Sequence, residues 1–299
     1  MEPLPRAVLA SEIARFLQLP LRGEELEISI ACPASEPTAQ AITFASRLSD
    51  QLVEQLNAVR LFVVATPDYD GKLRVPHVLT PRPRLAFARV LAKFFSPPIQ
   101  PTIAATAVIA TSAVLGPGVS VGHFSVIGER VSVGAGTEIR DHVVIRAGCT
   151  IGKQCLIKSH AVIGEEGYGF EFEDDHTPVR IPHLGTVIIG DEVEIGAMTV
   201  ITRATLSATV IADRVKIDDH VFIAHNVQIG ENTMVIAGAE VSGSVRIGKN
   251  AWIAPQACVI DHAQIGDGAL VGIGAVVTKA VAPGVIVAGN PARVLRKRD

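Results

Sequence analysis

Large aliphatic residues recur at every sixth position along most of residues 103–277. One series has eleven members from Ile103 to Ile163, and a second has twelve members from Ile211 to Val277. A shorter run between them comprises Ile189, Ile195 and Ile201. A glycine often follows the aliphatic residue, and the fifth position is small or β-branched. Six is the period of neither an α-helix nor a β-strand, so the pattern indicates a repeat architecture.

Three six-residue steps can close a triangular coil with one short strand on each side. The aliphatic side chains then fill the axis, and stacked coils satisfy each other's backbone groups. This is the hexapeptide pattern of a parallel β-helix with 18 residues per turn. Its resemblance to known hexapeptide-repeat proteins implies a left-handed coil.

The pattern also divides the chain. The register breaks between Ile163 and Ile189, so we expect a loop over 164–188, and four extra residues precede Ile211. Long loops on rigid scaffolds often carry binding residues. We expect three regions: a small domain over 1–98, a β-helix over 99–281 and a basic tail over 282–299.

Residues 1–98 do not follow the six-residue pattern. Residues 9–19 and 82–95 have helical spacing, and short apolar runs such as 61–66 are typical of strands. Ser96-Pro97-Pro98 marks the junction to the repeats. The sequence thus predicts a mainly β protein in which a small α/β domain precedes the β-helix.

Composition narrows the functional classes. A net charge of −3 and only 4% aromatic residues argue against nucleic-acid binding. No apolar run reaches the ~18 residues of a transmembrane helix, and the first residues lack the apolar core of a signal peptide. We therefore expect a cytoplasmic protein. The four cysteines form no C-x-x-C pair, and we expect no metal site; Cys149 and Cys155, six residues apart, are expected to be buried free thiols.

His225 and His262 stand out among the nine histidines by their spacing. They lie 37 residues apart, close to two coils of 18, so both belong on one side of the triangle. Two coils separate them by roughly 10 Å, which suits a groove for an extended substrate. Asp218 lies close enough in sequence to orient His225. Gly243 follows His225 by one coil, so its N–H could serve an oxyanion. A base and an oxyanion donor suffice for acyl transfer.

The stretch IDDHVFIAHNVQIG (217–230), the loop EGYGFEFEDD (166–175) with RIPHLG (180–185), and LASEIARFLQL and AITFAS in the first domain carry a specific resemblance. The chain resembles the UDP-3-O-acylglucosamine N-acyltransferases of lipid A biosynthesis over about residues 5–280. This implies transfer of an acyl group from a thioester to the amine of a UDP-linked amino sugar.

The resemblance also implies roles for individual residues. His225 would be the general base, oriented by Asp218, and the Gly243 N–H would stabilise the oxyanion. His262 would line the groove for substrate or for the pantetheine arm. Phe44 of AITFAS would stack on the uracil, although Asp50 stands where the family usually has a second aromatic residue.

Further residues are expected to bind substrate or donor. They are Tyr168, Phe170 and His183 of the 164–188 loop, Asn226 beside the base, and Arg293 of the tail. The resemblance implies a homotrimer with sites between chains, and we expect no permanently bound cofactor. The donor would be a 3-hydroxyacyl group on the phosphopantetheine of acyl carrier protein, or acetyl- or acyl-CoA.

Three alternatives remain open from the sequence. The ending VTKAVAPGVIVAGNPARVLRKR is similar to that of acetyl-CoA-dependent sugar acetyltransferases, which favours N- or O-acetylation of a nucleotide-linked sugar for O-antigen, the outer part of lipopolysaccharide. His220 and His225 have the spacing of histidine ligands in β-helix carbonic anhydrases, with His183 as a third ligand for zinc. A non-catalytic trimer is the third alternative.

Overall fold

The computed structural model describes residues 7–96 and 100–298. The chain divides into two compact units, up to residue 99 and from residue 100 onward. Within residues 7–96, a short antiparallel pair, β1 with β2, accompanies a four-stranded parallel sheet of order β3-β4-β5-β6. The helices expected near 9–19 and 82–95 are present as α1 and α3, and strand β5 occupies the expected run at 61–66.

The elements of this first unit follow in chain order. They are β1 (Val8–Leu9), α1 (Ala10–Leu17), β2 (Glu27–Ile28), β3 (Ile30–Ala31), β4 (Ala41–Ala45), α2 (Asp50–Asn57), β5 (Phe62–Ala65), the 3₁₀ turn η1 (Pro67–Tyr69), β6 (His77–Leu79), α3 (Pro83–Val90) and the π-helical turn η2 (Leu91–Phe95). Strand β5 is buried along its whole length, which is typical of a central parallel strand.

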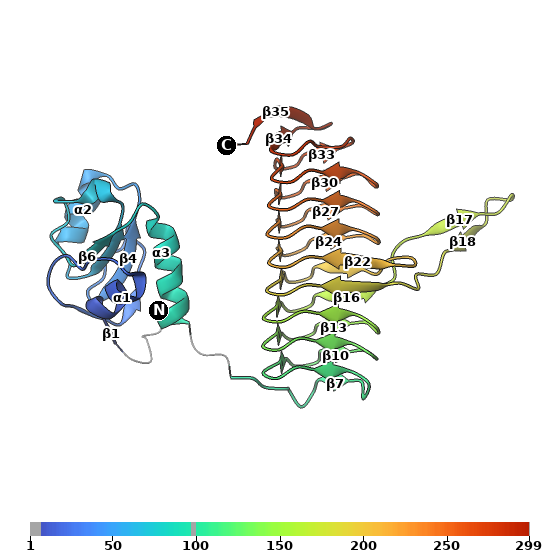
Figure 1. Ribbon diagram of the computed structural model, residues 1–299, viewed down its shortest axis with the longest axis horizontal. Coiled ribbons are helices and arrows are strands. Elements are labelled where there is room, and N and C mark those ends of the chain that lie inside the picture. The colour runs from blue at the N-terminus through green and yellow to red at the C-terminus, as the bar shows by residue number, and fades with distance from the viewer. Residues whose placement is uncertain (1–6, 97–99, 299) are drawn as a thin grey trace. The chain divides into compact units, whose positions relative to one another are not determined.

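The second unit is a stack of triangular coils (Figure 1). Within residues 100–298, its short strands pair in parallel into three sheets, one for each side of the triangle. Where no residues are inserted, each strand residue pairs with its equivalent 18 positions away, as Ile127 does with Ile145. The predicted left-handed parallel β-helix is confirmed.

We call the three sides the first, second and third faces. The first face comprises β7 (Val108–Ile109), β10 (Val126–Ile127), β13 (Val144–Ile145), β16 (Val162–Glu165), β21 (Val200–Thr202), β24 (Phe222–Ile223), β27 (Glu240–Val241), β30 (Cys258–Val259) and β33 (Val276–Val277). The second face comprises β8 (Val114–Leu115), β11 (Ser132–Val133), β14 (Thr150–Ile151), β19 (Thr186–Ile189), β22 (Ala208–Ile211), β25 (Gln228–Ile229), β28 (Arg246–Ile247) and β31 (Gln264–Ile265). The third face comprises β9 (Ser120–Val121), β12 (Glu138–Ile139), β15 (Leu156–Ile157), β20 (Glu194–Ile195), β23 (Lys216–Ile217), β26 (Met234–Val235), β29 (Trp252–Ile253), β32 (Leu270–Val271), β34 (Val285–Ala288) and β35 (Arg293–Lys297).

The aliphatic series fills the axis of the coils. Ile127, Ile163 and Ile223 are among the fully buried side chains of a single continuous core. Cys149 and Cys155 are buried free thiols in the same core. Ile103 is 55% exposed, because no coil precedes it to cover its side chain.

Both departures from the six-residue pattern open at one corner, between the first and second faces. Residues 166–185 leave the coil between β16 and β19 and form an antiparallel hairpin of β17 (Phe170–Phe172) and β18 (Pro178–Arg180). Figure 1 shows this hairpin projecting away from the stack of coils. The shorter insertion, residues 203–207, lies between β21 and β22. We call this the first corner, and it also contains His225, between β24 and β25.

The open end of the last coil is covered by the antiparallel pair β34 and β35. The guanidinium of Arg298 donates hydrogen bonds to the carbonyl oxygens of Asn250, Gly268 and Ala269, at 3.1–3.3 Å. These bonds satisfy carbonyl groups of the last coils. No helix in the described part of the chain is long and apolar enough to cross a membrane.

Candidate active site

His225 lies in the turn between β24 and β25, and its side chain is half-buried. The next residue, Asn226, has a left-handed backbone with φ of 63°, which asparagine adopts more readily than most residues. The N–H of Asn226 donates to the hydroxyl of Thr209 at 3.0 Å. The turn is thereby held in place by the neighbouring coil.

The amide of Asn226 determines the tautomer of His225. Oδ1 of Asn226 accepts from the backbone N–H of Thr205 at 3.2 Å and from its hydroxyl at 3.3 Å, which identifies this atom as the oxygen. The same oxygen lies 3.0 Å from Nδ1 of His225. Nδ1 must therefore carry the proton, and Nε2 retains the lone pair that a general base needs.

Gly243 lies one coil beyond His225, in the turn after β27. Its backbone makes way for the imidazole: a Cβ at this position would lie 2.7 Å from Cε1 and 2.9 Å from Nε2 of His225. Ser244 N–H donates to His225 O at 2.9 Å, which fixes the spacing of the two turns. The Gly243 N–H has no hydrogen-bond partner among residues 100–298. Gly243, whose N–H is unpaired, thus packs against the imidazole that carries the lone pair.

His183 joins His225 from the loop that begins at residue 164. It is only 3% exposed, and the two imidazoles make an edge-type contact with centroids 5.2 Å apart. Its Nδ1 lies 3.0 Å from Ile181 O, so Nδ1 carries the proton. Two glycines of the GYG segment, Gly167 and Gly169, leave room for the ring. The six-residue spacing did not predict that His183 contacts His225, because the loop lies outside the repeat.

Asp218 lies at a different corner from His225. It follows β23, between the third and first faces, and its Oδ2 accepts from the N–H of Ala237 at 3.3 Å. Within the described chain it makes no hydrogen bond to His225, and Asn226 occupies the position at Nδ1 that we expected for Asp218. The sequence feature that could have indicated the orienting residue is Asn226, an asparagine next to His225 at a corner position with a left-handed backbone.

His262 lies two coils beyond His225 at the first corner, but in the column of Asn226. Its φ of 59° matches the left-handed conformation of Asn226, and its N–H donates to Gly243 O at 2.9 Å. Its side chain is 77% exposed, with Nε2 4.0 Å from Oδ2 of Asp261. The 37-residue spacing, one more than two coils, accounts for this shift by one column.

The aromatic residues Tyr168 and Phe170 of the loop pack on each other, and no ring contact joins them to the two histidines within the described residues. Tyr168 is 85% exposed and packs on Phe170 with ring centroids 4.9 Å apart. The guanidinium of Arg180 lies over the Phe170 ring at 5.1 Å. These rings form a small exposed cluster at the base of the hairpin.

Phe44 and Arg293 lie elsewhere in the chain. Phe44, on β4 of the first unit, is half-buried and packs against Phe87 at 5.2 Å. Arg293, on β35, is exposed, and its guanidinium donates to Ala292 O. Arg293 and Lys279 line a cavity of about 260 Å³ at the end of the β-helix.

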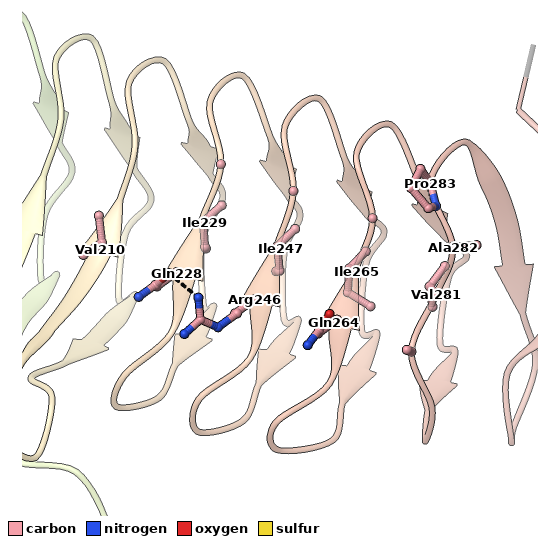
Figure 2. A pocket seen from close by; sticks show the side chains of 14 residues that line it. Val210, Gln228, Ile229, Arg246, Ile247, Gln264, Ile265, Val281, Ala282 and Pro283 are labelled. Carbon is pink, nitrogen blue, oxygen red and sulfur yellow. Dashed lines mark hydrogen bonds between the residues drawn. The ribbon is translucent and has the colours of Figure 1, made fainter.

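A groove of about 730 Å³ runs along the second face, beside the first corner. Its polar side chains, Gln228, Arg246 and Gln264, come from successive coils (Figure 2). Arg246 donates to Gln228 Oε1 at 3.2 Å. Gly230, Gly248 and Gly266 contribute backbone without side chains, and Pro283 lies near the last coil. The groove suits a long, thin ligand that crosses several coils.

The two histidines whose spacing suggested a zinc site, His220 and His225, do not come together within one chain. His220 lies at the corner between the third and first faces, separated from His225 by β24. The described residues hold no group of three or more histidine, cysteine or acidic side chains arranged to bind a metal ion.

No family model matches the chain. The UDP-3-O-acylglucosamine N-acyltransferase of Thermosynechococcus vestitus is 37% identical over 238 residues, covering 71% of this chain and 68% of that protein. The protein of the same name from Chlorobium chlorochromatii is 52% identical over 54 residues, 18% of this chain and only 15% of that relative's length.

Solved structures agree on the fold. UDP-N-acetylglucosamine O-acyltransferase (LpxA) from Moraxella catarrhalis superimposes with a TM-score of 0.59 and 28% identity, covering 64% of this chain and 73% of that chain. The UDP-N-acetylglucosamine acyltransferase of Francisella novicida gives a TM-score of 0.60 and 27% identity, covering 65% and 70%.

Proposed function

Because the chain belongs to the family of UDP-3-O-acylglucosamine N-acyltransferases, we propose that it transfers an acyl group from a thioester to the amine of a UDP-linked amino sugar. The substrate we favour is a UDP-3-O-acylglucosamine, in lipid A or related surface-polysaccharide biosynthesis in the cytoplasm. The 3-hydroxyacyl group of an acyl carrier protein is the favoured donor.

One observation carries the proposal. The imidazole of His225, held by Asn226 in the tautomer with its lone pair on Nε2, packs against Gly243, whose N–H is unpaired among residues 100–298. A general base and an oxyanion donor are the two groups that acyl transfer requires. Asn226 takes the orienting role that the sequence suggested for Asp218.

The reaction follows from these two groups. His225 Nε2 takes a proton from the amine as the nitrogen attacks the thioester carbonyl, and the C–N bond forms. The carbonyl oxygen becomes an oxyanion that accepts a hydrogen bond from the Gly243 N–H. The C–S bond then breaks, and the thiolate takes the proton from His225. The base contributes about 10²–10⁴-fold to the rate.

The groove on the second face supports a path for the donor's thioester arm. Its lining extends from Val210 past Gln228, three residues beyond His225, and crosses the coils to Pro283. A pantetheine arm is long, thin and rich in amide groups, which match the side chains of Gln228, Arg246 and Gln264. His262, exposed at the same corner, is proposed to line this path.

The end of the β-helix supports acyl-CoA as an alternative donor. Lys279 and Arg293 border a cavity there, and two cations suit the phosphate groups of acyl-CoA. In that case the reaction is N- or O-acetylation of a nucleotide-linked sugar. Replacing both cations with alanine should raise the KM for acetyl-CoA but not for a carrier protein.

The active form is proposed to be a homotrimer, as in the family that the chain resembles. The half-buried position of His225 and the exposure of Tyr168 and Leu184 are consistent with a second chain completing the site. Phe44, from the first unit, is proposed to stack on the uracil. Light scattering of the purified protein tests the trimer directly.

The proposed reaction is tested with the purified trimer and UDP-linked amino sugars. Each sugar is offered with 3-hydroxyacyl carrier protein and with acetyl-CoA, and mass spectrometry identifies N-acylated product. Product with at least one pair, lost on His225→Ala, supports the proposal. Absence of product with every pair would contradict it.

A further inference from the structure

The buried nitrogen of His183 lacks a partner. Nε2 of His183 is closed to water, and no group among residues 7–96 and 100–298 hydrogen-bonds to it. Leaving a buried acceptor unpaired destabilises a fold, so such atoms in native proteins call for an explanation. The opposite ring nitrogen already donates to Ile181 O, so Nε2 of the neutral ring is an acceptor only.

His183 and His225 have the same arrangement. Each imidazole donates through Nδ1 to an oxygen of its own turn, Ile181 O for His183 and Asn226 Oδ1 for His225. Each ring therefore retains a lone pair on Nε2, and the rings are in contact at 5.2 Å. Two acceptors with fixed tautomers lie next to each other at the first corner.

Gly167 keeps one side of both rings free of side chains. A Cβ at this position would lie 2.9 Å from Nε2 of His183 and 3.1 Å from Cδ2 of His225. In His225, Cδ2 is bonded to Nε2, so Gly167 borders the edges that carry both lone pairs. Gly167 belongs to the segment that leaves the coil at residue 166, and a small displacement of that segment would open both acceptors to a ligand.

We propose that His183 is the second acceptor for the nucleophilic amine, and that the pair selects an amine over a hydroxyl group. This inference rests on the proposed acyl transfer. An amine has two N–H groups. One donates to His225 Nε2 and loses its proton as the C–N bond forms, and the other donates to His183 Nε2 and stays in the amide product. A hydroxyl group has one proton and leaves one acceptor unpaired.

The other titratable groups at this corner have partners of their own. Arg203 donates to Gly164 O and Ala147 O, and Glu240 accepts from the hydroxyl of Ser242. Asp261 lies near His262. None of these side chains hydrogen-bonds to either imidazole, so Nε2 of each histidine stays available to the amine.

The test compares three variants of the full-length trimer. His183→Phe keeps a ring but removes the acceptor, His183→Gln restores an acceptor, and His176→Asn removes an exposed imidazole from the tip of the same hairpin. We expect His183→Phe to lower kcat for the amino sugar about 10- to 100-fold with little change in the donor KM. His183→Gln should recover part of this loss, and His176→Asn should behave as wild type.

The same variants are assayed with the matching UDP-sugar that carries a hydroxyl in place of the amine. The preference for amine over hydroxyl should fall in His183→Phe. Equal kcat and equal preference in wild type and His183→Phe would overturn the assignment. Stoichiometric zinc in wild type that is lost in His183→Phe would also overturn it, because the pair would then be a metal site.

A measurement without turnover separates this inference from the proposed function. In ¹⁵N spectra of the imidazoles, UDP-glucosamine should shift Nε2 of both His183 and His225, whereas UDP-glucose should shift Nε2 of only one of them. If both shifts occur but no sugar is acylated, the two histidines bind the amine as proposed and the proposed acyl transfer is wrong. If acyl transfer is unaffected by substitution of His183 and its Nε2 does not shift, the role of His183 is wrong but the proposed acyl transfer stands.

Discussion

Gly243 lies so close to His225 that a Cβ at position 243 would be 2.7 Å from Cε1 of the imidazole. The contact joins two successive coils, since Ser244 N–H donates to His225 O. The position of the proposed base therefore depends on the absence of a side chain one coil away.

Gly243→Ala should displace the imidazole and lower kcat about 10²-fold, because misplacement by about 1 Å has effects of this size. Steady-state kinetics measure the loss, and circular dichroism confirms that the coil survives. Gly268→Asn is the matched control, because nothing lies within 4 Å of that position and asparagine tolerates its positive φ. Full activity in Gly243→Ala would mean that the contact is unimportant.

His225→Ala should lower kcat by about 10²–10⁴-fold, the usual contribution of a general base. The side chain is half-buried at a turn, so the thermal midpoint should change little. Exposed His176 provides the control, through His176→Asn. Retention of more than a tenth of the wild-type kcat in His225→Ala would rule out the proposed base.

Two substitutions can distinguish the two roles of Asn226, as acceptor for His225 and as a residue with a left-handed backbone. Asn226→Asp keeps an acceptor for Nδ1 of His225, whereas Asn226→Gly keeps the left-handed backbone but removes the acceptor. We expect Asn226→Gly to lower kcat at least about 10-fold, with a much smaller loss in Asn226→Asp. Imidazole ¹⁵N shifts should report a mixture of tautomers at His225 in the glycine variant alone. Equal effects of the two substitutions would argue against an orienting role.

Arg298→Ala should weaken the end of the β-helix. Its guanidinium serves the carbonyl groups of Asn250, Gly268 and Ala269, so its loss should lower the free energy of unfolding by about 1–3 kcal/mol. Urea titration measures this change. Lys297→Ala is the control, because that exposed side chain serves no such carbonyl. Equal stability of the two variants would show that Arg298 does not hold the cap.

The buried thiols make stability depend on pH in the alkaline range. Burial raises the pKa of the Cys149 and Cys155 thiols above the ordinary value of 9.0. The unfolded chain then loses these protons at a lower pH than the folded chain, so stability falls as the pH rises through about 9. The Cys149→Ala, Cys155→Ala double variant should show a smaller decrease between pH 8 and 10 in urea titrations. An identical decrease in wild type and double variant would contradict this.

The fold could be predicted from the sequence because one physical requirement repeats in every coil. Each turn needs an aliphatic side chain at its axis, as Ile127 and Ile223 illustrate, so the period is visible without any structure. Ile103 satisfies the pattern but not the burial, since burial also requires a neighbouring coil. The period therefore identified the architecture but not its ends.

The site was less accessible to sequence reasoning. Spacing located His225 and Gly243 on successive coils, because backbone stacking alone decides that relation. The choice between Asp218 and Asn226 depends on which corner each side chain occupies and on the Thr205 hydrogen bonds, which no period encodes. His183 comes from a segment outside the repeat, so its contact with His225 had no counterpart in the pattern.

The insertions that leave the coil at residues 166–185 and 203–207 share the corner that holds His225. The axial residues before and after them keep their pairing, as Ile163 does with Ile201 and Ile189 with Ile211. The register shifts only locally, between Ile163 and Glu165, so residues added here leave the axis of the scaffold unchanged. Related proteins can therefore differ in loop length at this corner, and so in the acceptor substrates they bind. The other two corners and the axis remain constrained by packing.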